Sequence, residues 1–236
     1  MKITTVLFDL DGTLLPMDQN VFIKDYFTRL IRKVAPYGYD PALLEKAIWQ
    51  GSAAMVKNDG SRTNEEAFFE AFINIMGEGI RQHIPLFDEF YKNEFDLVRF
   101  ACGHTPAADA IVKLVRSLGL RAVLATNPLF PPEATLARIR WAGLDAGDFE
   151  LITTYDNSSY CKPNLKYYLS ICEKLGLSPG ECLMVGNDVG DDMPAGKLGM
   201  KTFLLEDCLI NPMKEDVSNY SRGGFEELEI IILELV

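Results

Sequence analysis

The stretch FDLDGTLL, residues 8–15, follows the β-branched and aliphatic run TTVLF, residues 4–8. A short apolar run of this kind, without alternating polar positions, predicts a strand that is buried on both faces of a parallel sheet. Asp9 and Asp11 stand where that strand ends. Because open parallel sheets bind ligands beyond the carboxyl ends of their strands, these two acids are candidate functional residues.

Gly12 and Thr13 complete the turn after the strand. Glycine permits a sharp backbone bend next to a site, and a threonine hydroxyl can anchor such a bend by hydrogen bonding. An Asp-x-Asp-Gly segment on its own would most often be only a turn. The strand before it and the polar residues that follow other strands favour a functional site here.

Four more apolar runs predict strands at residues 121–125, 150–154, 182–186 and 201–205. Amphipathic segments between them predict helices. Thr105 and Pro106 form a good start for the first, which ends at Gly119. Two further helices are expected at about 132–142 and 164–175, each followed by a glycine. Strands that alternate with helices indicate an α/β fold with a Rossmann-like parallel sheet.

Residues 17–100 have a different pattern, in which apolar residues recur three and four positions apart and strand-like runs are absent. We therefore expect a core domain of residues 1–16 and 101–236, with a helical domain of residues 17–100 inserted after the first strand. The many aromatic residues of this insert, such as Phe69 and Tyr91, are expected to pack as helix core.

Composition excludes several classes of function. The chain has 236 residues, and 34 acids against 23 bases give a net charge of −11 without a basic cluster, so no nucleic-acid partner is expected. No apolar run approaches the roughly 20 residues that span a bilayer, and no signal-peptide pattern opens the chain, which indicates a cytoplasmic protein without a membrane partner. The five cysteines form no CxxC pair, so neither a disulfide framework nor a structural zinc site is expected.

Other predicted strands also end in polar residues. Thr126 and Asn127 follow the second strand, and Lys162 lies in the loop beyond the third. The fourth strand is followed by four polar residues, Asn187, Asp188, Asp191 and Asp192. Because the strands are parallel, all these side chains are expected at one edge of the sheet.

Several carboxylates in one place resist joint ionisation unless a cation offsets them. Oxygen ligands suit Mg²⁺, and Lys162 adds a fixed positive charge. Together these cations would form a pocket for a phosphoryl group, whose oxygens Thr126 and Asn127 are expected to bind. Asp9, held at the strand end, is suited to attack phosphorus, and Asp11 is suited to protonate the leaving oxygen and later deprotonate water.

With these residues identified, the chain resembles a phosphatase of the haloacid dehalogenase (HAD) superfamily, C1-capped and similar to subfamily IA. DLDGT at 9–13 resembles the first motif, Ala-Thr-Asn at 125–127 the second, Lys162 with Pro163 the third, and GNDVGDD at 186–192 the fourth. The resemblance covers essentially the whole length. It implies a Rossmann-like core, Mg²⁺, an aspartyl-phosphate on Asp9, and a helical C1 cap that closes over the site.

The fourth motif departs from the family pattern. Many members have a Gly-Asp pair, whereas here Gly186 is followed by Asn187 and only then by Asp188. We assign Asp188 as a metal ligand and Asp192 as a supporting or ligating acid, while the alternative register places Asn187 in the ligand position. The resemblance then implies three metal ligands, Asp9, Asp11 and Asp188, with Gly12, Thr13, Asn187 and Asp192 in support.

Asp11 narrows the reaction, because dehalogenase and phosphonatase members lack an acid at this position, where a leaving alkoxide must be protonated. The resemblance predicts hydrolysis of a phosphomonoester of a small metabolite, since a closing cap would exclude a phosphoprotein. A phosphosugar mutase of the same superfamily keeps both acids and is the first alternative. A phosphate- or Mg²⁺-binding regulatory module with little turnover is an alternative from a different class.

The helical insert leaves the substrate open. Its aromatic residues are compatible with an apolar or nucleoside group. Seven of its cationic residues are possible contacts to an anionic substrate, although such side chains on helices are more often solvated. They are Lys24, Arg29, Arg32, Lys33, Lys46, Lys57 and Arg62.

Overall fold

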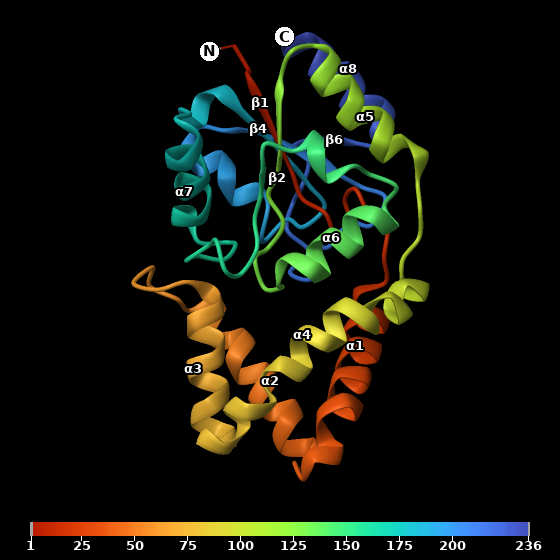
Figure 1. Cartoon of the computed structure of the whole chain (residues 1–236). Helices are drawn as coiled ribbons and strands as arrows, with labels where there is room; N and C mark the ends of the chain where they lie inside the picture. The colour runs from red at the N-terminus through yellow and green to blue at the C-terminus, as the bar shows by residue number, and fades with distance from the viewer. Residues whose placement is uncertain (1, 236) are drawn as a thin grey trace.

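Six strands form one parallel sheet in the computed structural model, which describes residues 2–235 (Figure 1). They are β1 (Thr5–Phe8), β2 (Arg121–Leu124), β3 (Leu151–Ile152), β4 (Cys182–Gly186), β5 (Lys201–Leu205) and β6 (Ser221–Gly223). Their order across the sheet is β3-β2-β1-β4-β5-β6. The chain order reverses on the two sides of β1, where Phe8 pairs with Leu124 of β2 and Val185 of β4. Such a reversal is where open α/β sheets place their ligand sites.

The α/β fold with a helical insertion after the first strand is confirmed, and the five expected strands lie at the expected positions. Strand β6 was not predicted, because its three residues, Ser-Arg-Gly, are polar or small and contribute no apolar run. The C-terminal helix α8 (Phe225–Leu235) also lies outside the sequence-based expectations.

Helices cover both faces of the sheet, as the uninterrupted apolar strands require. On one face, Leu7 of β1 packs with buried residues of α7 (Leu165–Leu175). On the other face, Phe8 belongs to a core that includes residues of α5 (Pro106–Ser117), α6 (Pro132–Trp141) and α8. Thr105 caps α5 by accepting a hydrogen bond from the Ala107 amide, as its position before Pro106 predicts.

The insert contains four α-helices in the lower half of Figure 1: α1 (Gln19–Val34), α2 (Pro41–Val56), α3 (Asn64–Met76) and α4 (Pro85–Asn93). Their starts follow from local capping chemistry. Asp18 accepts hydrogen bonds from two amides of the first turn of α1, and Asp40 precedes Pro41 at the start of α2. Thr63 and Glu66 form a capping box at the start of α3.

Short 3₁₀ helices complete the element order: η1 (Ala35–Tyr37), η2 (Glu78–His83), η3 (Phe95–Ala101), η4 (Ala146–Asp148), η5 (Pro179–Glu181) and η6 (Met193–Leu198). No helix within residues 2–235 has the length and apolar character needed to cross a membrane.

The helical insert meets the core at two places. The chain enters and leaves the insert side by side, because the Asp18 amide donates to the Ala101 carbonyl at 3.2 Å and the Gly103 amide donates to the Pro16 carbonyl at 2.6 Å. At a distance from this crossing, the start of α3 contacts the core loops that follow β2 and β3. There the buried Asn64 donates its side-chain amide to the Pro128 carbonyl at 3.2 Å and to the Cys161 Sγ at 3.3 Å. The insert is therefore fixed to the core at two separate places, the start of α1 and the start of α3.

Candidate active site

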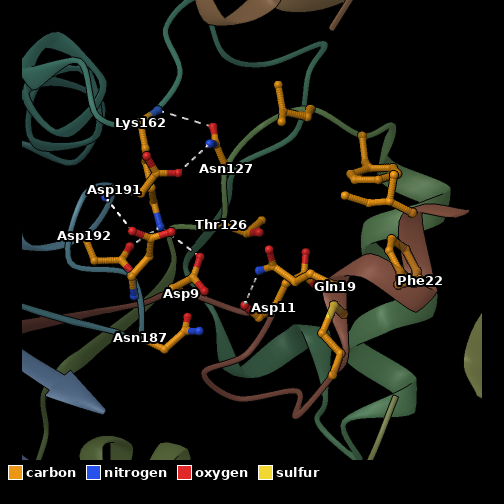
Figure 2. Close-up of a pocket in the computed structure, with 15 residues that line it drawn as sticks. Asp9, Asp11, Gln19, Phe22, Thr126, Asn127, Lys162, Asn187, Asp191 and Asp192 are labelled. Carbon is orange, nitrogen blue, oxygen red and sulfur yellow. Dashed lines mark hydrogen bonds and ion pairs between the residues drawn. The ribbon is translucent and has the colours of Figure 1, made fainter. Parts of the chain in front are cut away.

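Asp9 lies immediately beyond β1 at the centre of the sheet, and its side chain is only 10% exposed. Its amide donates to the Val185 carbonyl of β4 at 2.9 Å, which fixes the backbone. The Thr13 hydroxyl donates to one carboxylate oxygen at 3.1 Å, and the Lys162 Nζ donates to the other at 2.8 Å. The carboxylate is therefore held in one orientation at the strand end (Figure 2).

Lys162 connects two acids. Its ammonium group is buried and donates to Asp9 and, at 2.6 Å, to an oxygen of Asp192, as Figure 2 shows. Burial lowers the pKa of the Lys162 ammonium, but attraction from Asp192 and Asp9 outweighs this effect and raises the pKa above its ordinary value. Burial also raises the pKa of Asp192, and the Lys162 charge opposes that shift. One cation thus compensates two buried carboxylates.

The loop after β4 gives its acids and its amide different surroundings. The Thr13 hydroxyl shares its one proton between Asp9 and the Asn187 carbonyl oxygen, which lies 3.0 Å away, and the Asn187 amide donates to the Cys208 carbonyl at 2.6 Å. Asn187 also lies against Gly12, where an added Cβ would come within 2.3 Å of the Asn187 amide and where φ is +90°. Gly12 is required there for both space and backbone conformation.

Asp188 faces the opposite situation. One of its carboxylate oxygens accepts hydrogen bonds from the Gly190 and Asp191 amides, at 2.8 and 3.1 Å. Its second oxygen receives no hydrogen bond from residues 2–235, and the residue lines the same cavity as Asp9. Its own amide donates to Asp192 at 3.0 Å. Asn187 is therefore occupied by structural contacts on both ends of its amide, whereas Asp188 keeps one carboxylate oxygen available.

Asp11 is paired with a buried arginine that the sequence did not point to. The Arg138 guanidinium, fully buried in α6, donates to one oxygen of Asp11 and lies over the Phe130 ring at 4.3 Å from its centroid. The other oxygen of Asp11, Oδ1, is buried and has no hydrogen-bond partner within residues 2–235. Burial raises the pKa of Asp11, and the Arg138 charge only partly offsets this.

Thr126 and Asn127 follow β2, as expected. The Thr126 carbonyl accepts hydrogen bonds from the Thr153 and Tyr167 hydroxyls, at 2.6 and 2.9 Å. These two bonds fix the backbone at Thr126. The Asn127 side chain accepts from the Lys162 backbone amide at 3.3 Å and donates to Asp191 at 3.2 Å (Figure 2). Asn127 therefore ties the loops after β2, β3 and β4 to one another.

One cavity of about 210 Å³ collects these side chains at the carboxyl edge of the sheet, and we call it the strand-end cavity. Eight of the predicted site residues line it: Asp9, Asp11, Thr126, Asn127, Lys162, Asn187, Asp188 and Asp192. Gly12 and Thr13 lie beneath it, in contact with Asn187. The insert forms one wall of the cavity. There Gln19, at the start of α1, donates to the Asp11 main-chain carbonyl at 3.4 Å.

Sequence reasoning missed Arg138 and Gln19 in this site. Arg138 lies in α6, and no motif surrounds it. An arginine side chain on a helix is ordinarily solvated, so its sequence position gave no reason to place it in the site. Gln19 is an uncharged residue at a helix start and carries no chemical signal of its own. Asp191, one of the four polar residues after the fourth strand, also lines the cavity, although no role was predicted for it.

The strand-end cavity offers oxygen atoms as ligands for Mg²⁺. Within residues 2–235, no three acidic, histidine or cysteine side chains come close enough together to hold a metal ion by themselves. Mg²⁺ is usually bound by only one or two carboxylates, with water and substrate phosphate completing its octahedron. Asp9 and Asp188 supply two carboxylates on one cavity wall, and Asp11 has a main-chain oxygen there. The residues present therefore fit Mg²⁺ when water and phosphate contribute ligands.

Comparison with known proteins adds independent evidence. The family model of haloacid dehalogenase-like hydrolases matches residues 3–199. A curated Bacillus subtilis (strain 168) protein named "Putative phosphatase YhcW" is 27% identical over 128 residues, which are 54% of this chain and 57% of that protein. The chain thus matches little more than half the length of this relative.

Two solved structures illustrate the shared fold. A 2-haloacid dehalogenase from Pseudomonas syringae pv. Tomato DC3000 has a TM-score of 0.63 at 18% identity, covering 99% of this chain and 100% of that one. The HAD-hydrolase YfnB from Bacillus subtilis, in a magnesium-bound structure, has a TM-score of 0.56 at 19% identity, covering 98% of this chain and 99% of that one. At these identities the likeness is one of fold.

Proposed function

The chain belongs to the haloacid dehalogenase-like hydrolase family, and from this premise we propose that it is a Mg²⁺-dependent phosphomonoester hydrolase acting through an aspartyl-phosphate on Asp9. The observation that carries the proposal is the fixed carboxylate of Asp9, which Thr13 and Lys162 hold at the wall of a polar cavity with a second acid beside it. A rigidly held carboxylate is suited to covalent catalysis because little reorganisation precedes its attack.

In the first step, an Asp9 oxygen attacks phosphorus and the bond from phosphorus to the ester oxygen breaks. The leaving oxygen takes a proton from the Asp11 carboxyl group. In the second step, Asp11 removes a proton from water, which attacks the same phosphorus and releases phosphate from Asp9. The raised pKa of Asp11 supports this role, since burial favours the protonated form that a general acid must have.

The charge of the transferred group is balanced by the surrounding residues. Lys162, already between Asp9 and Asp192, places a positive charge beside the phosphoryl position. Thr126 and Asn127 would bind the phosphoryl oxygens from the β2 side of the cavity. Arg138 holds the Asp11 side chain in place through their ion pair. These fixed groups would stabilise the negative charge of the transition state without reorganising.

Asp9 and Asp188 would hold Mg²⁺ through their carboxylates, with Asp11 contributing its main-chain oxygen because Arg138 engages its side chain. When bound, the metal ion would neutralise phosphoryl oxygens during transfer. The free oxygen of Asp188, compared with the fully hydrogen-bonded Asn187 amide, supports Asp188 as the ligand of the fourth motif.

The test is release of inorganic phosphate from small phosphomonoesters, measured in the presence of Mg²⁺ and again after chelation. No phosphorylated activator is added to the assay. We expect Asp9→Asn to reduce kcat by at least about 10³-fold, and Asp11→Asn by about 10²- to 10⁴-fold. Asp207→Asn, which changes an exposed acid, is the matched control and should leave kcat unchanged.

Full activity in Asp9→Asn, or in metal-depleted protein, would refute the mechanism. Metal binding decides the register of the fourth motif: Asp188→Asn should weaken Mg²⁺ binding by at least about tenfold, whereas Asn187→Ala should chiefly lower the melting temperature. The opposite pattern would assign the ligand position to Asn187.

A further inference from the structure

A second cavity, of about 110 Å³, lies between the four helices of the insert and the core loops that carry Leu129, Phe130 and Tyr155, and we call it the cap chamber. All four helices of the insert contribute to its wall, including Tyr26 and Phe27 of α1, Trp49 and Ser52 of α2, Phe69 of α3 and Tyr91 of α4. Aromatic side chains that the sequence suggested as helix core thus divide into two groups. Phe72 and Phe90 are completely buried, whereas Phe69 and Tyr91 border the chamber.

The cap chamber adjoins the strand-end cavity. Ile23 of α1 and two residues of the loop before α6, Leu129 and Phe130, line both. A ligand with its phosphoryl group at Asp9 would therefore have the cap chamber next to it, on the side of the insert. The same Phe130 ring packs on the Arg138 guanidinium that holds Asp11.

The chamber wall offers little to a polar ligand. No lysine, arginine, aspartate or glutamate is among its lining residues within 2–235. The hydroxyls of Tyr26 and Tyr91 are hydrogen-bonded to each other. Burial raises the pKa of Tyr26 to about 12, so this phenol stays neutral at physiological pH. The remaining polar groups of the wall are the Ser52 and Tyr155 hydroxyls and the Trp49 indole N–H. They are too few to replace the water contacts of a polyhydroxyl group, and none carries a charge to balance a carboxylate, so burial of either group is unfavourable.

The cationic residues of the insert are not available to a second anionic group. None of the seven borders either cavity. Arg29 pairs with Asp25, Lys33 with Glu94, and Arg62 with Glu70, all within the insert. The two cavities therefore provide positive charge only at the sheet edge, where one phosphoryl group would lie.

We infer that the cap chamber binds the organic group of the substrate, and that the substrates are phosphate monoesters of aromatic or other bulky apolar alcohols. This inference rests on the proposed function for the position of the phosphoryl group. Its physical basis is that each apolar group moved from water into the chamber favours binding, whereas hydroxyls and carboxylates would be desolvated there without partners.

Two esters of primary alcohols separate the chamber from leaving-group chemistry: 2-phenylethyl phosphate and glycerol 3-phosphate. Their leaving alkoxides are of similar basicity, so a difference in kcat/KM reports on recognition of the organic group. We expect kcat/KM to be about 10- to 100-fold higher for the phenylethyl ester. Acetyl phosphate, whose organic group is too small to fill the chamber, measures the chemistry of the strand-end cavity alone.

Ser52→Phe is designed to fill the chamber from α2 without removing any core side chain. It should lower kcat/KM for 2-phenylethyl phosphate by about tenfold or more and leave that for acetyl phosphate within about twofold. Ser52→Ala removes only the hydroxyl and should change neither value. Leu43→Phe places the same phenyl ring at an exposed position of the same helix, and should also change neither.

If Ser52→Phe does not fold, as judged by circular dichroism, Ser52→Val provides a smaller obstruction with a proportionally smaller loss. The inference is overturned if acetyl phosphate is hydrolysed while the two esters have equal kcat/KM, or if filling the chamber affects all substrates alike. Binding of 2-phenylethanol, followed by the emission of Trp49 on the chamber wall, gives a readout independent of catalysis. A response in the wild type that Ser52→Phe abolishes would support the chamber even if no phosphate ester were hydrolysed, in which case only the proposed function would fail.

Discussion

The strand-end cavity and the cap chamber are neighbours that were built by opposite means. The first gathers charged and amide side chains at the ends of parallel strands, and hydrogen bonds hold Asp9, Lys162 and Asp192 in place. The second is lined mainly by aromatic and aliphatic side chains, from four helices of the insert and from two core loops. In the first cavity, position is determined by polar partners. In the second, it is determined by packing.

This difference separates the part of the molecule that holds fixed charges from the part that shapes an apolar volume. A reaction needs charges at fixed places, and strand ends provide these because the sheet holds their backbones. Selection among organic groups needs a shaped apolar volume, and helices of an insert can provide one without disturbing the charges. Changes in the two regions should therefore have different consequences, and the following variants test this from the largest effect to the smallest.

Lys162→Met should have the largest effect, because it leaves the buried carboxylates of Asp9 and Asp192 without their shared cation. Loss of one partner of a buried ion pair costs about 3–5 kcal/mol of stability. Phosphate release should fall by at least about 10³-fold, because the fixed charge beside the phosphoryl group is also lost. Urea denaturation and the phosphate assay measure the two effects, and Lys166→Met, at an exposed position, is the control. Near-normal values in both would contradict the charge balance described for this cavity.

Arg138→Met should come next, with a cost of about 3 kcal/mol in the free energy of unfolding. The Arg138 side chain is fully buried, whereas Asp11 is 21% exposed, so water can reach part of the group left behind. Replacing both residues, as Arg138→Met with Asp11→Leu, should restore most of that stability, since neither charge then remains. A double variant as unstable as the sum of its parts would show that the two side chains are not coupled. Arg140→Met, on the same helix but exposed, should change stability by no more than about 0.5 kcal/mol.

Asn64→Ala tests how firmly the two regions are held together. The buried Asn64 side chain donates to the Pro128 carbonyl of the core at 3.2 Å and accepts from the Asn58 amide, within the insert, at 2.9 Å. Leaving such groups unpaired should cost about 1–3 kcal/mol and should increase proteolysis within the insert before the core unfolds. Asn74→Ala, exposed on the same helix, is the matched control. Equal proteolysis of the two variants would exclude this contact as a fastening point.

The smallest effect is expected for Glu150→Gln, at the surface of the core and outside both cavities. Hydrogen bonding to Arg121, at 2.6 and 2.7 Å, lowers the pKa of Glu150 below its ordinary value. The folded state therefore favours the ionised form, and the stabilisation is complete above the unfolded pKa and disappears as pH falls through the folded pKa. Because the pair is exposed, the loss at pH 7 should be at most about 0.5 kcal/mol. The difference from wild type in urea denaturation should shrink as pH falls below the ordinary glutamate pKa and vanish once Glu150 is protonated in the folded state; a difference that persists in acid would contradict a charge interaction.

Prediction from the sequence succeeded for residues whose position in the fold depends on local order along the chain. Asp9, Thr126 and Asp188 each follow a recognisable strand, and parallel strands bring their ends to one edge whatever the intervening residues are. It failed for β6, whose polar residues pair only because β5 lies beside them. It failed also for Arg138, whose role depends on α6 lying against the turn that carries Asp11.

The sequence by itself determined the α/β fold, the helical insert and the set of polar residues around Asp9, because strand and helix periodicity and short motifs are local properties of a chain. Only the tertiary structure decided that Asp11 pairs with Arg138, that Asn187 is engaged by Thr13 while Asp188 keeps a free oxygen, and that the insert encloses an apolar chamber. A cavity is the volume that packed side chains from separate helices leave unfilled. It has no signature in any one of those helices, and it exists only once they are assembled.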